Sequence, residues 1–404
     1  MKFIFSSFDR ACLDLDWRLP IVIELIDKGH TVTVFLPNIY KSTVISPNIS
    51  LLQDSKVKIV YRNELINITY FLVKIINYFS LPMHNLFIKI FLKLDNFLLK
   101  QLFFKNRAKT KILDLLTTND VVISGNYPGI PIDFVEYHFY KIAKESNIFF
   151  VGTPIVALSN WSQREIYPFD LFLISSTSES ANAEKLHHNV KFFGCPSFEL
   201  SYKANSLNKN NSINFNNENK VVLIILVNND NAFFQDLNQV NETNNIIRTL
   251  LDHDYNVVVK SHPRTNYIIK YLVGLGDRVV FVNDPIDDLS KEVDFVISFT
   301  SSTIYKAIAN KCQTVHFVPQ NFFKSPSLRK KINDVARDMY YKNLDSDDMW
   351  LDQFCPRVGN TIDLMRVLQN YSNVDFENFH INFVNVFKPQ NASCNIVKFI
   401  LKVV

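Results

Sequence analysis

Two short polar segments of this 404-residue chain contain residues whose types suit the binding of an anion. Residues 260–264 read Lys-Ser-His-Pro-Arg, and residues 301–303 read Ser-Ser-Thr. The first segment supplies positive charge, and the second supplies hydroxyl groups. Hydroxyl residues that open a helix also add free backbone N–H donors, which suit a phosphate group. We therefore predict that these two segments bind an anionic group.

Each polar segment lies within a few residues of the end of a run of β-branched and aromatic residues. The runs at 257–259 and 295–297 are typical of strands buried in a parallel sheet. In such sheets, ligands bind outside the carboxyl ends of the strands. We therefore expect the side chains of His262 and Ser301 to meet at one site, within about 15 Å of each other.

Strand-like runs alternate with helical periodicity along most of the chain. Strands are expected at 2–7, 30–36, 56–61, 120–124, 148–152 and 170–174, and again at 220–227, 257–259, 278–282, 294–297 and 314–318. Helices are expected between them, including 16–28, 131–146, 236–252 and 302–310. This alternation predicts βαβ units and two consecutive, doubly wound α/β domains.

A segment rich in Asn, Ser and Lys separates the two predicted domains. We expect an N-terminal domain at 1–203, a linker at 204–219 and a C-terminal domain at 220–357. Residues 358–404 include a helix at 360–370 and are expected to pack back toward the N-terminal domain.

Composition excludes several classes of protein. The formal net charge of +4 and the absence of a basic stripe argue against a nucleic-acid partner. The chain has no dinucleotide-binding glycine motif and no Walker A loop, which argues against NAD oxidoreductases and P-loop ATPases. Five scattered cysteines fit a reducing cytosol. No uncharged run reaches the ~20 residues of a membrane span, and we expect a cytoplasmic protein.

A basic, apolar stretch lies between residues 65 and 113. Eight Lys and Arg residues stand there against one acid, Asp95. Core-packed helices with solvated lysines are the favoured interpretation. A peripheral contact with the inner face of the cell membrane, salt-sensitive and selective for anionic lipid, is the alternative.

The order of predicted strands and helices in two consecutive α/β domains resembles that of a GT-B glycosyltransferase, in which two Rossmann-like domains face a central cleft. The resemblance implies an acceptor on the first domain and a nucleotide-activated donor on the second. More locally, His262-Pro263 and residues 301–303 resemble the paired HP and SS/ST motifs of bacterial sialyltransferases and polysialyltransferases. Similar pairs occur in capsule Kdo transferases and CDP-glycerol glycerophosphotransferases.

The resemblance implies roles for individual residues. His262 would contact the donor phosphate and act in catalysis, and Pro263 would hold its loop. The donor would also be bound by Lys260, Arg264, Ser301, Ser302 and Thr303. The alternatives are purely structural roles. His262 would hydrogen-bond to backbone at the end of its strand, and the hydroxyl residues would only cap a helix.

The general base is less well defined by sequence. The acidic-acidic-glycine motif that carries it in many of those sialyltransferases is absent from this chain. Asp14, near the first predicted helix, is our candidate, followed by Asp9. Residues 14–16 resemble the DxD metal motif of GT-A enzymes, but they begin a helix, so we predict no metal site. Asn126 and Glu136 are candidates for binding the acceptor.

The implied function is an inverting, metal-independent glycosyltransferase of bacterial surface polysaccharide (capsule or lipopolysaccharide) biosynthesis. Its donor would be a nucleotide sugar, as a substrate and not a cofactor, and a CMP-linked acid sugar such as sialic acid is expected. A saccharide or lipid-linked molecule would be the acceptor. One alternative is an enzyme like UDP-N-acetylglucosamine 2-epimerase, although that family usually has Ser-Gly-Gly and Glu where this chain has residues 301–303 and Lys306. A non-catalytic assembly subunit is a third possibility.

Overall fold

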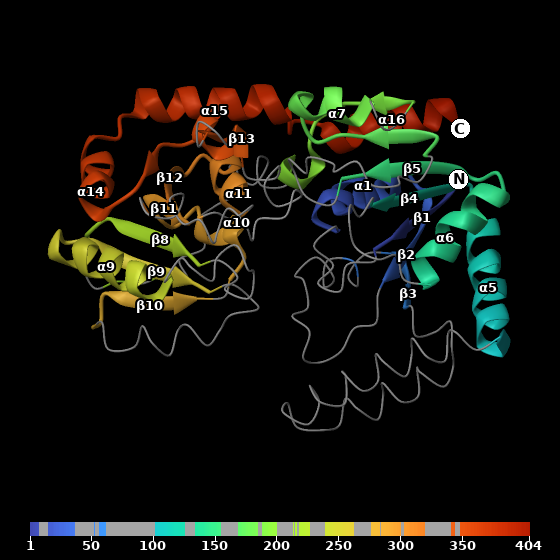
Figure 1. The fold of residues 1–404 in the computed structure, drawn as a ribbon, viewed down its shortest axis with the longest axis horizontal. Helices are drawn as coiled ribbons and strands as arrows, with labels where there is room; N and C mark the ends of the chain where they lie inside the picture. Colours follow the sequence, from blue (N-terminus) through green and yellow to red (C-terminus); the bar gives the residue numbers. More distant parts are fainter. Residues whose placement is uncertain are drawn as a thin grey trace. The chain divides into compact units, whose positions relative to one another are not determined.

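The structure is a computed structural model of the chain. It describes residues 1–7, 15–36, 52, 56–61, 102–125, 134–154, 169–184, 188–199, 213, 215, 218–226, 239–261, 276–282, 284–299, 303–319, 341–343 and 348–404. The chain divides into two compact units. Unit 1 comprises Met1–Ser197 and Asn391–Val404, and unit 2 comprises Phe198–Gln390. Each unit is an α/β domain built on its own sheet (Figure 1).

Unit 1 contains a sheet of seven parallel strands. These are β1 (Lys2–Ser6), β2 (Thr31–Leu36), β3 (Lys58–Tyr61), β4 (Val121–Gly125), β5 (Phe149–Thr153), β6 (Leu171–Leu173) and β7 (Val190–Lys191). Their order across the sheet is β3-β2-β1-β4-β5-β6-β7, and every neighbouring pair is parallel. The chain adds strands in one direction from β1 and then in the other from β4, so the switch point of this sheet lies between β1 and β4.

Helices supply the apolar layers of unit 1. They are α1 (Leu15–Asp27), α5 (Leu102–Thr117), α6 (Phe134–Glu145), α7 (Ser180–Glu184) and α16 (Ala392–Val403). Helices α5 and α6 lie side by side and pack Ile112, Leu116 and Phe139 against Ile4 and Val122 of the sheet (Figure 1). Helix α16 packs against α1, which brings the end of the chain into the first unit.

One glycine of this sheet is required by close packing. A Cβ atom added to Gly152 in β5 would lie 2.5 Å from Cδ2 of Phe172 and 2.6 Å from Cδ2 of Phe169. Non-bonded carbon atoms prefer separations of about 3.5–4.0 Å. The absent side chain therefore allows both rings to lie directly on the strand.

Unit 2 contains a second parallel sheet, of six strands. These are β8 (Val221–Ile225), β9 (Asn256–Lys260), β10 (Val279–Val282), β11 (Phe295–Ser298), β12 (Gln313–Phe317) and β15 (Arg357–Val358). Their order is β10-β9-β8-β11-β12-β15, which places the switch point between β8 and β11. A separate antiparallel pair joins β13 (Tyr341–Asn343) to β14 (Asp348–Met349).

Helices cover both faces of the second sheet. On one face, α9 (Gln239–Asp252) and α14 (Thr361–Asn370) bury Ile246, Leu250 and Leu364 against the strands. On the other face, α10 (Ile286–Leu289) and α11 (Thr303–Ala309) contribute Leu289 and Ala307. Helix α15 (Asn373–Phe387) packs against α11. Tyr305 of α11 meets Phe387 of α15 in an aromatic cluster that also includes Phe198, Phe354 and Phe383.

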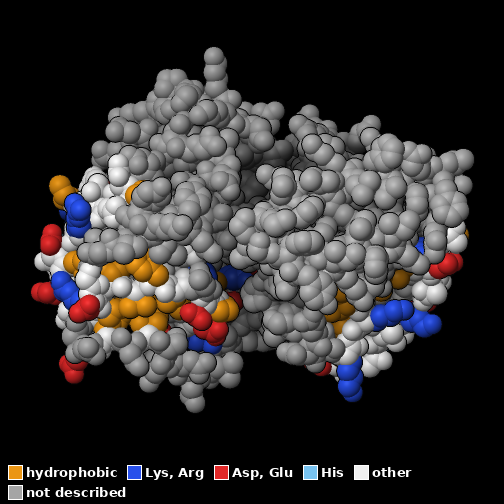
Figure 2. Space-filling model, turned by 90° about the horizontal axis from the view of Figure 1, so that it is seen from below, with side chains coloured by type: hydrophobic (Ala, Val, Ile, Leu, Met, Phe, Trp, Pro, Cys, Tyr) orange, Lys and Arg blue, Asp and Glu red, His pale blue; other side chains and the backbone are white. Residues whose placement is uncertain are grey.

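The predicted fold class, with two doubly wound parallel α/β domains, is confirmed. Each strand expected from sequence has a counterpart in the structure, although the strands β7, β13, β14 and β15 and helix α15 were not predicted. Most of the expected linker at 204–219 lies outside the described residues, so its boundaries stay predictions. On the described surface seen in Figure 2, acidic and basic side chains lie among apolar ones. No helix in the described part of the chain is long and apolar enough to cross a membrane.

Candidate functional site

The structure describes a minority of the residues singled out from sequence. Lys260 ends β9, Thr303 begins α11, and Glu136 belongs to α6, where only its backbone is described. The others lie outside the described residues, and their roles stay predictions: Asp9, Asp14, Asn126, His262, Pro263, Arg264, Ser301 and Ser302. So does most of the basic stretch from Lys74 to Lys111, whose described part is in α5.

The strands that lead into the two polar segments are placed as the anion-site hypothesis requires. Strand β9 ends two residues before His262, and β11 ends three residues before Ser301. Strand β8 lies between them, and all three run parallel. Neighbouring strands are about 4.8 Å apart, so β9 and β11 end roughly 10 Å from each other at the same edge of the sheet. This edge adjoins the switch point between β8 and β11, where α/β proteins bind ligands.

Lys260 brings a positive charge to this edge. Its Nζ donates a hydrogen bond of 2.5 Å to the backbone carbonyl of Asp284, just beyond β10. Partial burial lowers the pKa of Lys260 below its ordinary value, and the nearby negative charge of Asp284 opposes that shift. An ammonium group has three hydrogen-bond donors, so a lysine at this edge can bind several acceptors at once.

A row of side chains crosses the sheet at the same level as Lys260. Cross-strand register pairs Lys260 with Ile225, Ile225 with Ser298, Ser298 with His316, and His316 with Arg357. Paired residues of parallel strands project to the same face of a sheet. The row therefore joins Lys260 to three polar residues that sequence reasoning did not assign to the site.

Ser298 is the member of this row next to the switch point. Its side chain is buried, and its Oγ has no hydrogen-bond partner among the described residues. Buried polar atoms are rarely left without a partner in proteins. Ser298 was overlooked because it ends an otherwise apolar run, where a lone serine carries no sequence signal.

His316 extends the row and is completely buried. Its Nδ1 lies 3.7 Å from Oδ1 of Asp352, whose Oδ2 lies 3.1 Å from Nη1 of Arg357. Burial lowers the pKa of His316, while the nearby negative charge of Asp352 acts in the opposite direction. The positive charge of Arg357 also lowers the pKa of His316, and burial is the largest of these effects. We interpret this trio as a link between β12 and the Trp350–Gln353 turn.

The carboxyl edge of the first sheet also holds a polar network. The fully buried Arg18 of α1 donates from Nε to Thr153 Oγ1 at 2.9 Å and from Nη1 to the carbonyl of Ser6. Ser6 Oγ in turn donates to Ser124 Oγ at 2.6 Å. These bonds hold the first turn of α1 at the ends of β1, β4 and β5, beside the switch point of that sheet. Asp14 directly precedes this turn in the sequence.

No protein-family model matches the sequence, and no curated protein matches it either. Solved structures are similar in fold. A protein assigned as a UDP-N-acetylglucosamine 2-epimerase from Listeria monocytogenes aligns with a TM-score of 0.57 and 10% identity, over 99% of this chain and 95% of that one. The UDP-GlcNAc 2-epimerase from Neisseria meningitidis, bound to UDP-GlcNAc, aligns with a TM-score of 0.51 and 12% identity over the full length of both chains. The calicheamicin glycosyltransferase CalG4 aligns with a TM-score of 0.53 and 10% identity, over 98% and 97%.

These similarities concern the fold. The chain has the two-domain architecture found in GT-B glycosyltransferases and in the 2-epimerases, and it is similar to proteins of both kinds over almost their whole length. At 10–12% identity, these comparisons do not identify which residues of this chain form its site.

Proposed function

We propose that this protein is an enzyme acting on a nucleotide sugar, and more narrowly a glycosyltransferase whose donor binds at the carboxyl edge of the second sheet. One observation carries the proposal. The strands that lead into the His-Pro and Ser-Ser-Thr segments are separated by one strand only, at the switch point where α/β proteins bind ligands. The GT-B architecture supports it, because structural neighbours with that fold include a glycosyltransferase and an epimerase bound to UDP-GlcNAc.

The chemistry follows from the residue types at this edge. When the bond between sugar and nucleotide breaks, negative charge grows on the departing phosphate. His262 and the hydroxyls of Ser301 and Ser302 would stabilise that charge as hydrogen-bond donors, and Lys260 would add a nearby cation. The attacking hydroxyl of the acceptor needs a base, for which Asp14 stays our candidate. The products would be the new glycoside and the free nucleotide.

The donor nucleotide is the finer part of the proposal. The resemblance of His262-Pro263 and residues 301–303 to sialyltransferase motifs favours a CMP-linked acid sugar. The fold comparison instead favours a uridine nucleotide, since one neighbour is bound to UDP-GlcNAc. We keep CMP as the proposed nucleotide because the motif argument concerns the site residues themselves.

An epimerase is the second candidate, and the structural neighbours support it. The sequence at the site argues against an epimerase, because Lys306 occupies the position where those enzymes usually have a glutamate. Lys306 lies on α11, with its Nζ 3.9 Å from Asp287 Oδ2. In this chain it contributes an ion pair between α10 and α11.

Thermal unfolding with CMP, CDP, UDP, GDP and ADP tests the nucleotide, because a ligand specific for the folded state raises the melting temperature. We expect CMP or CDP to give the largest rise. Incubation with UDP-N-acetylglucosamine alone tests the reaction class. Epimerisation without an acceptor would overturn the transferase assignment, and the absence of any nucleotide effect would favour the non-catalytic alternative.

A further inference from the structure

The helix that follows the Ser-Ser-Thr segment is too short to hold its own position. Helix α11 has seven residues and begins at Thr303. Isolated helices shorter than about 12–15 residues are marginally stable in water, so the position of such a helix depends on its tertiary contacts. Residues 301–303 are the hydroxyl residues proposed to bind the donor, and Thr303 belongs to α11 itself. The contacts of α11 therefore decide where part of the donor site lies.

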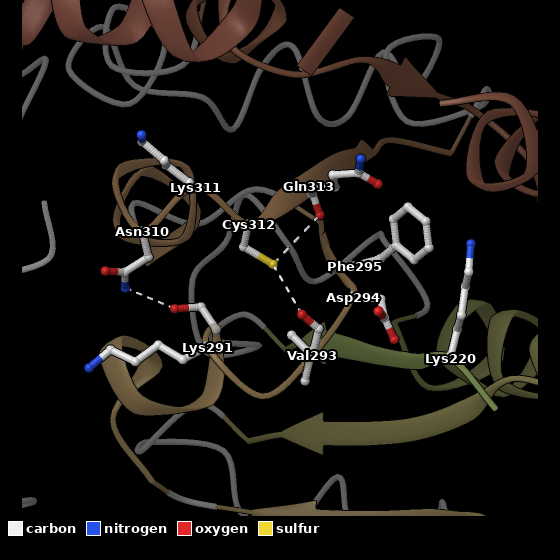
Figure 3. A pocket seen from close by; sticks show the side chains of 10 residues that line it. Lys220, Lys291, Val293, Asp294, Phe295, Asn310, Lys311, Cys312 and Gln313 are labelled. Carbon is white, nitrogen blue, oxygen red and sulfur yellow. Dashed lines mark hydrogen bonds between the residues drawn. The ribbon is translucent and has the colours of Figure 1, made fainter. Parts of the chain in front are cut away.

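One set of contacts ties α11 to α10 and to the residues that follow α10. Asn310, which directly follows α11, donates from Nδ2 to Ser290 Oγ at 2.8 Å (Figure 3). In the same figure, the thiol of Cys312 points to the carbonyl oxygen of Val293, 3.8 Å away. The ion pair of Lys306 acts between the same two helices. These contacts hold one flank of α11.

Helix α15 holds another side of α11. His380 Nδ1 lies 3.1 Å from the backbone carbonyl oxygen of Ile308. A carbonyl oxygen only accepts hydrogen bonds, so Nδ1 carries a proton and is the donor. Nearby, the ring centroid of Tyr305 lies 5.6 Å from that of Phe387. Tyr305 and Ile308 are three residues apart, and His380 and Phe387 are seven apart, so one side of each helix forms the contact.

The imidazole of His380 is flanked by two rings of its own helix. Its interplanar angle is 18° with Phe383 and 29° with Phe376, so the three rings are stacked. Their centroids lie 6.4 Å and 6.2 Å from that of His380. Phe383 in turn contacts Phe387 of the aromatic cluster, at 4.9 Å. Because the imidazole has neighbours on both sides, its bond to Ile308 has a defined direction.

We propose that His380 is a positioning residue for the donor site: its hydrogen bond to Ile308 fixes α11, and thereby places Thr303 and the hydroxyl residues before it. This inference rests on the proposed function. Ile308 lies five residues beyond Thr303, roughly 7.5 Å along a helix, so His380 acts through α11 and not by contact with the nucleotide. Without this bond α11 would be less well ordered, and nucleotide binding would include the cost of ordering it.

Calorimetric titration with CMP, CDP and UDP tests this role. His380→Leu keeps a side chain of similar size but removes the donor. It should weaken binding of whichever of these nucleotides the wild type binds by about two- to tenfold, the usual effect of losing one neutral hydrogen bond. His380→Asn places an amide N–H at the position of the Nδ1–H and should restore wild-type affinity. Wild-type affinity in His380→Leu, or equally weak binding by His380→Asn, would overturn the inference.

The matched control is His253→Leu. His253 Nδ1 makes the same kind of bond, 2.8 Å to the backbone carbonyl oxygen of Thr249, but at the end of α9. Equal losses of affinity in the two leucine variants would assign the effect to general stability and would overturn the inference. Melting temperatures verify that each variant folds. If His380→Leu did not fold, His380→Gln, whose amide lies one bond further from the backbone, takes its place.

The tautomer of His380 is a test that needs no nucleotide. The nitrogen chemical shifts of the neutral imidazole should show the proton on Nδ1, and a proton on Nε2 would overturn the inference. The titrations also separate this inference from the proposed function. If the wild type bound none of the three nucleotides, the donor site itself would be contradicted. If it bound one and His380→Leu bound that nucleotide equally well, only the role of His380 would be contradicted.

Discussion

Lys260 Nζ donates a 2.5 Å hydrogen bond to the backbone carbonyl of Asp284, and this bond ties the end of β9 to the chain just beyond β10. It also holds the ammonium group at the edge where the nucleotide is proposed to bind. The group is partly buried, so its charge is less screened than that of a surface lysine. Lys260 is thus the described residue on which the electrostatics of the donor site can be tested directly.

Replacing Lys260 by Met should weaken nucleotide binding by about tenfold or more, since a charged hydrogen bond is worth roughly 1.5–3 kcal/mol. Because burial lowers the pKa of Lys260, wild-type affinity should begin to fall at a pH below the ordinary lysine value of 10.5. Calorimetric titrations across pH measure both effects. An affinity equal to that of the wild type in Lys260→Met would show that the ammonium group does not contact the nucleotide.

His262→Ala should lower kcat by about 100-fold or more, the usual cost of removing a donor that stabilises a developing charge. Ser301→Ala should lower kcat less than His262→Ala does, because Ser302 and Thr303 remain.

Asp14→Asn should lower kcat without changing donor affinity if Asp14 is the base. Steady-state kinetics with a melting curve for each variant provide the test. Wild-type turnover in a folded His262→Ala protein would leave the transferase proposal with the architecture as its only support.

His316 predicts a pH dependence of stability. Its pKa is lowered in the folded state by burial, so the unfolded chain binds a proton more readily. The stabilising contribution is therefore complete above pH 6.5 and is lost as the pH falls through the lowered pKa. One such proton changes the free energy of unfolding by at most about 1.4 kcal/mol per pH unit.

Denaturant unfolding between pH 7 and pH 5 measures this contribution, and His316→Gln should reduce the slope of stability against pH. His188→Gln, the same replacement at an exposed position, is the matched control. The NMR titration of the His316 imidazole reads its pKa without a mutation. A His316 pKa at or above 6.5 would contradict the prediction.

Gly152→Ala should destabilise unit 1 by about 1–3 kcal/mol, the usual cost of adding a methyl group to a packed core. The new Cβ would overlap the rings of Phe169 and Phe172. A double-mutant cycle with Phe172→Leu isolates the overlap, because the smaller side chain should recover part of the loss. Additive effects of the two substitutions would indicate that the strand moves away from the rings instead.

Local pattern predicted most of the fold because buried parallel strands are continuous apolar runs, as in Val221–Ile225 and Phe295–Ser298. The two-residue strands β7 and β15 are too short to show a period. Helix α15 was missed because its Asn, Val and Phe residues have low helix propensity, although Phe376, Phe379, Phe383 and Phe387 recur at helical spacing.

The site was less predictable than the fold, for a physical reason. Which strand ends neighbour one another depends on strand order, and which side chains share a row depends on register. Ser298 and His316 join Lys260 only through the order β9-β8-β11-β12. Neither order nor register is encoded in the spacing of residues along the chain.

Calorimetric titration of the wild-type protein and of the double variant His262→Ala with Ser301→Ala, each with CMP, CDP and UDP, tests the central claim most directly. We predict that the wild type binds at least one of the three nucleotides. We further predict that the double variant, folded by its melting curve, binds that nucleotide at least about tenfold more weakly, as expected for the loss of phosphate donors. If the wild type bound none of them, or if the folded double variant bound the nucleotide as tightly as the wild type, a donor site at the carboxyl ends of β9 and β11 would be contradicted.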